Sequence, residues 1–268
     1  MKILPLVDLK ITERVTCYLI QVPPFAELCE SSDSEKPGSA TIINQDQEFL
    51  GYLSYDKNNL IGKGTFKTAH LASLNWASHP PISGLGAKNS QSIAVALKRP
   101  YDDRNMNSGA VKRFNYADES RKVLTEATLL GWADSLLRFA YAFIHDFIAD
   151  KKPAEPPFPI PLLRFVKAAI AYSEKPLVNA PGTSSGTSHR AAYLLEELLP
   201  DRPFIKYIHN AEAVPLQDIN ELGHDIGVFL CFIQHVQFVH THGQAYISDF
   251  QGTYENLTLG PTLLNHFY

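Results

Sequence analysis

Residues 60–71 read LIGKGTFKTAHL, and residues 93–98 read IAVALK. The first stretch predicts a strand, a tight turn around Gly62 and Gly64, and a second strand, because strand-forming residues flank the glycines. The second stretch predicts a short strand that ends in Lys98. Glycines have no Cβ and let backbone N–H groups approach an anionic ligand. A glycine pair in a hairpin is more often structural, so both interpretations stay open at this point.

A long helix is the next clear feature. Residues 118–148 place apolar side chains at steps of three and four, which is the spacing of one helix face. Glu126 lies within this stretch. A strand-borne lysine can pair with nucleotide phosphates while an acid from a neighbouring helix holds it, so Lys98 and Glu126 are candidates for such a pair. The alternative is that Lys98 is a surface lysine whose aliphatic stem covers apolar surface.

The rest of the chain alternates between polar loops and short apolar segments. Ser, Gly, Pro and Asn gather in three stretches that we expect to be loops, at residues 29–40, 75–92 and 173–190. The apolar segments predict a strand or short helix over Ile160–Tyr172, short elements at Ala191–Leu199 and Phe204–Ile208, a second helix over Leu216–Val239 and a strand over Gln244–Ile247.

Composition argues against several classes of protein. The 268 residues carry a net charge of -4, which argues against binding to nucleic acid or to an anionic membrane. Three cysteines do not make a disulfide framework. The first twenty residues hold no uninterrupted apolar stretch such as a secretory signal needs. We therefore expect an intracellular, cytoplasmic protein, with a nuclear location also open, and neither a membrane nor a nucleic-acid partner.

A glycine turn, a strand lysine and a helix acid in this order resemble the small lobe of a protein kinase. A conventional kinase should also show His-Arg-Asp and Asp-Phe-Gly. The chain has no His-Arg-Asp, and its residues 249–252 read DFQG. The closer resemblance is to the alpha-type (atypical) serine/threonine protein kinases. The blocks that carry it are Gly62–Ala69 with Val95–Lys98, Tyr193–Glu197, Phe204–Asn210 and Ala245–Gly252, and they occur in family order.

This resemblance implies an α+β, two-lobed protein-kinase-like fold with an ATP cleft. It divides the chain into a variable segment 1–45, a β-rich small lobe 46–195 with insertions at 75–92 and 173–190, and a reduced large lobe 196–268. It also implies transfer of the ATP γ-phosphate to serine or threonine of a protein substrate.

The resemblance further implies a set of site residues. Lys98 would contact the phosphates, and Glu196 would lie at the hinge near the adenine. Asp249 and Gln251 would face the phosphates and Mg²⁺, because carboxylate and amide oxygens suit this ion. The complete set for ATP and Mg²⁺ is Gly62, Gly64, Lys98, Glu126, Glu196, Lys206, Asn210, Asp249 and Gln251, with Lys98 and Asp249 as catalytic residues. As alternatives, Lys206 and Asn210 are surface or turn residues, and Glu196 is a solvated strand-end charge.

Two departures from the family pattern affect the expected activity. Leu259 and Gly260 stand where relatives have a second active-site aspartate, and neither can bind a metal or accept a proton. The family's late His and Cys residues for zinc have no counterpart after Cys231, so the carboxyl end looks incomplete. His235, His240, His242 and His266 lack regular ligand spacing, and we do not expect zinc. Three hypotheses follow: an active kinase, a pseudokinase that binds nucleotide or a partner, and an unrelated α+β fold.

Overall fold

The computed structural model describes residues 10–32, 42–77, 85, 92–102, 111–151, 156, 158–174, 190–199, 204–253 and 262–266. Within these ranges the chain forms a mixture of helices and strands. In chain order they are β1 (Lys10–Leu19), α1 (Phe25–Ser32), β2 (Phe49–Lys63), β3 (Lys67–Trp76), β4 (Ser92–Pro100), α2 (Tyr116–Lys151), β5 (Leu163–Phe165), β6 (Ala168–Ser173), β7 (Ala192–Glu197), β8 (Phe204–Lys206), α3 (His224–His240), β9 (Phe250–Thr253) and β10 (Thr262–His266).

The chain divides into two compact units. Unit 1 comprises residues 1–20, 43–128 and 167–198, and unit 2 comprises residues 21–42, 129–166 and 199–268. The units interleave along the chain, and α2 contributes residues to both. The lobes expected at 46–195 and 196–268, and the variable segment expected at 1–45, stay predictions.

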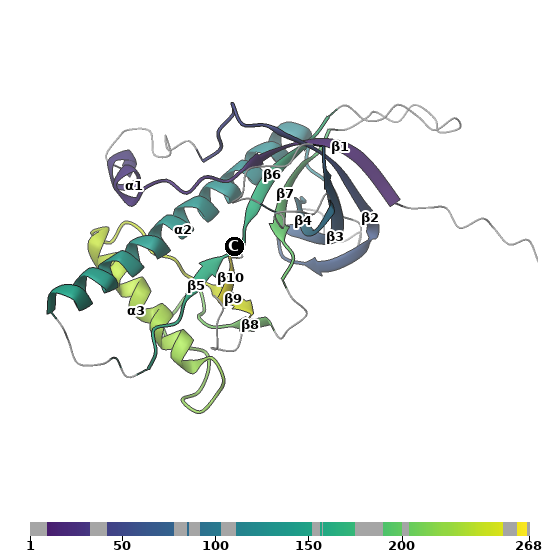
Figure 1. The fold of residues 1–268 in the computed structure, drawn as a ribbon. Helices are drawn as coiled ribbons and strands as arrows, with labels where there is room; N and C mark the ends of the chain where they lie inside the picture. The colour runs from purple at the N-terminus through teal and green to yellow at the C-terminus, as the bar shows by residue number, and fades with distance from the viewer. Residues whose placement is uncertain are drawn as a thin grey trace, which may run out of the picture. The chain divides into compact units, whose positions relative to one another are not determined.

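Unit 1 is built around a closed β-barrel. Its strands follow the order β1-β2-β3-β4-β7-β6, and every neighbouring pair is antiparallel (Figure 1). Successive side chains of a strand point to opposite faces, and one face of each strand is apolar. These apolar side chains form a single core that includes Val15, Leu53, Leu74, Val95, Leu97 and Leu195. Barrel closure leaves no free sheet edge among these strands.

Unit 2 contains a four-stranded sheet and the helix α3. The sheet has the order β5-β10-β9-β8, with β5 and β10 parallel and the other pairs antiparallel. The core of this unit joins α3 to the second half of α2 and to the sheet, and it includes Leu137, Phe165, Tyr207, Leu230, Ile233 and Phe250. Figure 1 shows α3 beside the strands β8 and β9, which carry residues from the last two sequence blocks.

The long helix predicted over 118–148 is confirmed as α2, residues 116–151. Its first turn is capped by the side chain of Asn115, whose Oδ1 accepts a hydrogen bond from the Asp118 backbone N–H at 2.9 Å. The predicted hairpin around the glycine turn and the strand ending near Lys98 are also confirmed, as β2, β3 and β4. Within the described ranges, none of the helices combines the length and apolar character that a membrane span requires.

Two predicted elements in unit 2 differ from the structure. The helix expected from Leu216 begins only at His224, because Gly223 adopts a left-handed φ of 93° and ends a series of turns. The strand expected over Gln244–Ile247 is wrong. The backbone of Ile247 is paired with side chains instead of a strand, since its N–H donates to Gln237 and its carbonyl accepts from Gln234.

Gly131 marks a place where another segment approaches α2 closely. A Cβ built on this glycine would lie 2.8 Å from the carbonyl oxygen of Gln21 and 3.1 Å from Cδ1 of Ile42. Both contacts are shorter than an ordinary van der Waals contact, and the first is to backbone. The glycine is therefore required by packing, although glycine weakens a helix interior by about 1 kcal/mol relative to alanine.

We expect Gly131→Ala to destabilise the protein by about 1–3 kcal/mol, because overpacking outweighs the gain in helix propensity. Urea unfolding followed by circular dichroism measures this change. Ala142→Gly, at an exposed position of the same helix, serves as the control and should cost only the propensity difference of about 1 kcal/mol. A Gly131→Ala protein more stable than the parent would contradict this account of the packing.

Candidate functional site

Lys98 and Glu196 form a buried ion pair on the outer face of the barrel. Val95 and Leu97 on β4 belong to the barrel core, so Lys98 points to the opposite face. The register pairs Ala96 with Glu196 and Lys98 with Leu194, which makes Lys98 and Glu196 diagonal neighbours on one face. The Lys98 Nζ lies 2.6 Å from Oε2 of Glu196, and the two side chains are only 3% and 2% exposed.

Burial and charge act in opposite directions on Lys98. Burial lowers the pKa of its amine, and the carboxylate of Glu196 partly offsets this by favouring the charged form. Removing two charges from water costs several kcal/mol per ion, so a buried pair is weak evidence for a stabilising role. A buried amine with a lowered pKa and a specific carboxylate partner is instead a feature of functional sites.

Glu126 also lies in this cluster, with a different partner from the one expected. The sequence analysis paired it with Lys98, whereas Lys67 of β3 donates to Glu126 at 2.8 Å. Glu126 is still near enough to raise the pKa of Lys98, and Lys67 is near enough to lower it. The structure therefore adds Glu196 as a partner of Lys98 and brings two lysines and two glutamates together in unit 1.

A second polar cluster, which the sequence analysis missed, fastens α2 to the barrel. Glu119 is fully buried and accepts hydrogen bonds from Arg99 Nε at 2.6 Å and from the Ala192 backbone N–H at 3.1 Å. Arg113 donates to the carbonyl oxygens of Arg99 and Pro100. The sequence signal was the position of Glu119 one turn before Val123 on the apolar face of α2, where a carboxylate needs a buried cation. This cluster holds the first turns of α2 against β4 and β7.

The glycines of the hairpin have room for side chains. Gly64 donates its N–H to the Lys67 carbonyl at 2.9 Å, and its own carbonyl accepts from the Tyr101 hydroxyl at 2.7 Å. A Cβ on Gly62 or Gly64 would meet no atom closer than 3.8 Å. Neither glycine has the left-handed φ found at Gly223 and Gly243. The hairpin itself does not require these glycines, and their role in binding phosphate stays a prediction.

The last sequence block supplies a second ion pair, in unit 2. The Lys206 Nζ lies 2.6 Å from Oδ1 of Asp249, with the side chains 39% and 16% exposed. Asp249 adopts a left-handed φ of 58°, an uncommon conformation for a residue with a side chain. The next residue, Phe250, is buried in the core of the unit and starts β9. In β9, Gln251 is paired in register with Lys206, so Lys206, Asp249 and Gln251 lie together.

Asp249 and Gln251 are a chemically reasonable but minimal set of ligands for a divalent ion. Mg²⁺ is commonly held by one or two carboxylates, with phosphates and water as its other ligands. The ammonium of Lys206 lies beside the Asp249 carboxylate and occupies one of its oxygens. Among the described residues, no three His, Cys, Asp or Glu side chains are placed so that they could hold a metal ion. Leu259 and Gly260 lie outside the described residues.

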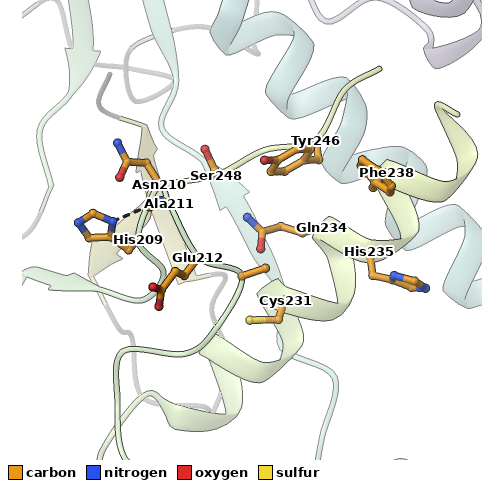
Figure 2. A pocket seen from close by; sticks show the side chains of 11 residues that line it. His209, Asn210, Ala211, Glu212, Cys231, Gln234, His235, Phe238, Tyr246 and Ser248 are labelled. Carbon is orange, nitrogen blue, oxygen red and sulfur yellow. Dashed lines mark hydrogen bonds between the residues drawn. The ribbon is translucent and has the colours of Figure 1, made fainter. Parts of the chain in front are cut away.

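Asn210 follows β8 and lines a pocket within unit 2. The pocket has a volume of about 270 Å³ and lies between residues 209–213, the helix α3 and the segment that leads to Asp249 (Figure 2). His235, one of the four histidines considered above for zinc, also lines it. Of the expected site residues, the structure thus groups Lys98, Glu126 and Glu196 in unit 1, and Lys206, Asn210, Asp249 and Gln251 in unit 2.

The mixed α/β content of the chain and its β-rich unit fit a kinase-like fold. The sequence model of the alpha-kinase family matches residues 87–264. This range is more than half of the chain, and the protein therefore belongs to the alpha-kinase family. No curated protein matches the chain. The match to the alpha-kinase family excludes the hypothesis of an unrelated α+β fold. Membership indicates a protein kinase, a class that uses ATP with a divalent ion and acts on proteins. Gly62 and Gly64 precede the matched range, so the family match does not include them and their assignment to the nucleotide stays a prediction.

We expect Glu196→Gln to lower the free energy of unfolding by about 3 kcal/mol, because the ammonium of Lys98 is left buried without its carboxylate partner. Chemical unfolding at neutral pH measures the loss. The control Glu48→Gln, at an exposed position of the same unit, should change stability by less than about 0.5 kcal/mol. Adding Lys98→Met to Glu196→Gln should recover most of the loss. Equal stability of Glu196→Gln and the parent would contradict a buried charged pair.

We expect Gly62→Ala and Gly64→Ala to leave the thermal midpoint within a few degrees of the parent, because both positions have room for a Cβ. If backbone at this turn approaches phosphate, each change should weaken binding of Mg-ATP by about tenfold. Isothermal titration calorimetry checks the affinity, and Gly51→Ala is the contrasting variant, because its Cβ would lie 3.0 Å from Leu74 and 3.1 Å from a backbone carbonyl. Unchanged affinity in both turn variants would assign the glycines a purely structural role.

Proposed function

We propose that this chain is an alpha-type serine/threonine protein kinase that transfers the γ-phosphate of ATP to a protein substrate, with Mg²⁺ as the divalent ion. The observation that carries the proposal is the buried Lys98–Glu196 pair within the range that matches the family. The apolar core of the barrel is complete without an ion pair on the outer face of the strands. The pair does, however, hold the Lys98 amine in a fixed position. Such an amine suits the recognition of a polyphosphate.

In unit 1 we assign the nucleotide-binding role to Lys98, with Glu196 as the positioning residue. Glu196 was expected near the adenine, but its carboxylate is 2% exposed and paired with Lys98, so we assign it the task of holding the amine. Glu126 and Lys67 complete the charge balance around this amine. The Gly64 N–H already donates to the Lys67 carbonyl, so other backbone N–H groups of the turn around Gly62 and Gly64 would donate to phosphate oxygens, as in other phosphate-binding loops.

In unit 2 we assign the catalytic role to Asp249, supported by Lys206, Gln251 and Asn210. The left-handed backbone at Asp249 and the ion pair with Lys206 fix the direction of its carboxylate. When bound, Mg-ATP supplies the phosphoryl group and the cationic charge that stabilises its transfer. Asp249 and Gln251 would provide oxygen ligands to the ion. In this assignment the substrate hydroxyl oxygen would form the new P–O bond as the bond to the ADP oxygen breaks, and the Asp249 carboxylate would accept the hydroxyl proton.

A pseudokinase is the second candidate, and the sequence at residues 259–260 favours it. Leu259 and Gly260 replace the second acid that the family pattern has at this place. With a single carboxylate, the chain would hold the divalent ion less tightly, and phosphoryl transfer would be slow while nucleotide binding persists.

The test combines a thermal-shift titration of Mg-ATP with transfer of radiolabelled phosphate to a basic acceptor protein. We expect the full chain to be stabilised by millimolar Mg-ATP and to label the acceptor. Asp249→Asn should reduce transfer at least about 100-fold with a smaller effect on the thermal shift, because it removes the proton acceptor but keeps the shape. Lys98→Met should abolish the shift. Lys57→Met, on exposed surface of unit 1, is the control and should change neither result.

The remaining outcomes separate the two candidates. A thermal shift that depends on Lys98 without any phosphate transfer would support the pseudokinase. The absence of a shift at millimolar Mg-ATP would contradict both, because each requires a bound nucleotide.

A further inference from the structure

The pocket of about 270 Å³ in unit 2 contains an unsatisfied buried acceptor. Gln234 of α3 lines the pocket and is only 4% exposed. Its Nε2 donates to the Ile247 carbonyl at 2.7 Å. Its Oε1 is buried and accepts no hydrogen bond from any group in the part of the chain that the structure describes. A buried acceptor without a hydrogen-bond partner lowers the stability of a protein by about 1–3 kcal/mol. A ligand that donates a hydrogen bond to this oxygen would therefore be favoured.

The direction of the Gln234 amide is fixed by its neighbour. A carbonyl oxygen can only accept, so the NH₂ group must face Ile247 and the oxygen must face the other way. Figure 2 shows the Gln234 head group extending from α3 toward the segment that carries Glu212. The unpartnered atom is therefore the acceptor Oε1, and this assignment does not depend on an arbitrary choice between the two amide orientations.

The other lining groups favour a flat, cationic ligand rich in donors. Phe238 and Tyr246 lie edge to face, with ring centroids 6.1 Å apart and an interplanar angle of 70°. Aromatic faces attract cations, and most often the guanidinium of arginine. Glu212 places an exposed carboxylate on the opposite side of the pocket. An acceptor amide, a carboxylate and an aromatic pair complement a guanidinium, which is planar and has five N–H donors. The ammonium of lysine is compact and more strongly hydrated, and it fits this set less well.

The size and position of the pocket indicate where the guanidinium comes from. Sites for whole drug-sized ligands occupy about 300–1,000 Å³, so about 270 Å³ suits a single long side chain better than a nucleotide. Ser248 lines the pocket and directly precedes Asp249. Consecutive Cα atoms are about 3.8 Å apart, so an arginine seated here belongs to a peptide that passes close to Asp249.

We propose that this pocket binds the guanidinium group of an arginine, supplied by the protein substrate a few residues from the phosphorylated hydroxyl. The proposal rests on the function proposed above for the source of the arginine, but not for the binding itself. Gln234 Oε1 and Glu212 accept from the guanidinium, and Phe238 and Tyr246 contact its face. Binding needs neither ATP nor transfer, so it can be measured separately.

The test uses fluorescein-labelled, nine-residue alanine-based peptides with a central serine and one arginine at each offset from that serine, and it follows anisotropy with the full chain. We expect at least one arginine peptide to bind about tenfold or more tightly than its citrulline counterpart, in which the guanidinium becomes a neutral urea of similar shape. The lysine counterpart should bind more weakly than the arginine peptide. Glu212→Gln and Tyr246→Ala should each reduce the preference for arginine about fivefold or more. Both positions are exposed, so these variants should fold, and a thermal melt checks this.

The control is Asp146→Asn, which makes the same charge change at a side chain that is 82% exposed and does not line the pocket. It should keep the full preference. Equal binding of the arginine and citrulline peptides, or an equal loss in Asp146→Asn, would overturn the proposal. Free arginine that competes as well as the best peptide would keep the guanidinium site and assign it to a small molecule. An arginine preference in a protein that shows no Mg-ATP thermal shift would leave the pocket standing while the proposed kinase function fails.

Discussion

The ion pair between Lys98 and Glu196 depends on the register of the barrel more than on either residue alone. Lys98 faces outward only because Val95 and Leu97 face the barrel core. A slip of one residue between β4 and β7 would turn the Lys98 side chain into that core. The amine of Lys98 would then be separated from the carboxylate of Glu196. The closed order of six antiparallel strands, fastened by the buried carboxylate of Glu119, prevents such a slip. The barrel thus holds the Lys98 amine, buried and paired with Glu196, in a defined position.

Unit 2 solves a related problem with different means. Asp249 precedes a strand and is directed by its left-handed backbone and by Lys206, whereas Phe250 anchors the segment in the core. The residues just before it have no strand partners, and their backbone is held by Gln234, Gln237 and Thr241 of α3 and its end. These side-chain bonds leave space for the pocket beside Asp249. The same irregular segment therefore positions the proposed catalytic carboxylate and lines the proposed arginine site.

Regular periodicity in the sequence predicted the parts of the fold that depend on one apolar face. The helix α2 follows from such a pattern, whereas the hairpin β2–β3 and the strand that carries Lys98 were predicted from the glycine turn and from strand-forming residues. The segment 244–247 could not be predicted in this way, because the pairing of Ile247 comes from glutamines on a helix and leaves no trace in its own residues. The barrel closure was not predictable either, since it needs the pairing of β1 with β6, whose partners lie 150 or more residues apart in the sequence. Motif order identified the family, which the comparison confirms, but motifs did not reveal that Glu196 is the partner of Lys98. That pairing depends on strand register, and the pocket depends on residues from three separate segments.

Labelling with the acyl phosphate of ATP tests the central claim most directly, because this reagent acylates an amine that lies beside the bound phosphates. The account predicts that mass spectrometry finds the acyl group on Lys98, that excess Mg-ATP prevents this modification, and that Asp249→Asn weakens it. Labelling spread over exposed lysines, with none at Lys98 and no protection by Mg-ATP, would contradict the account.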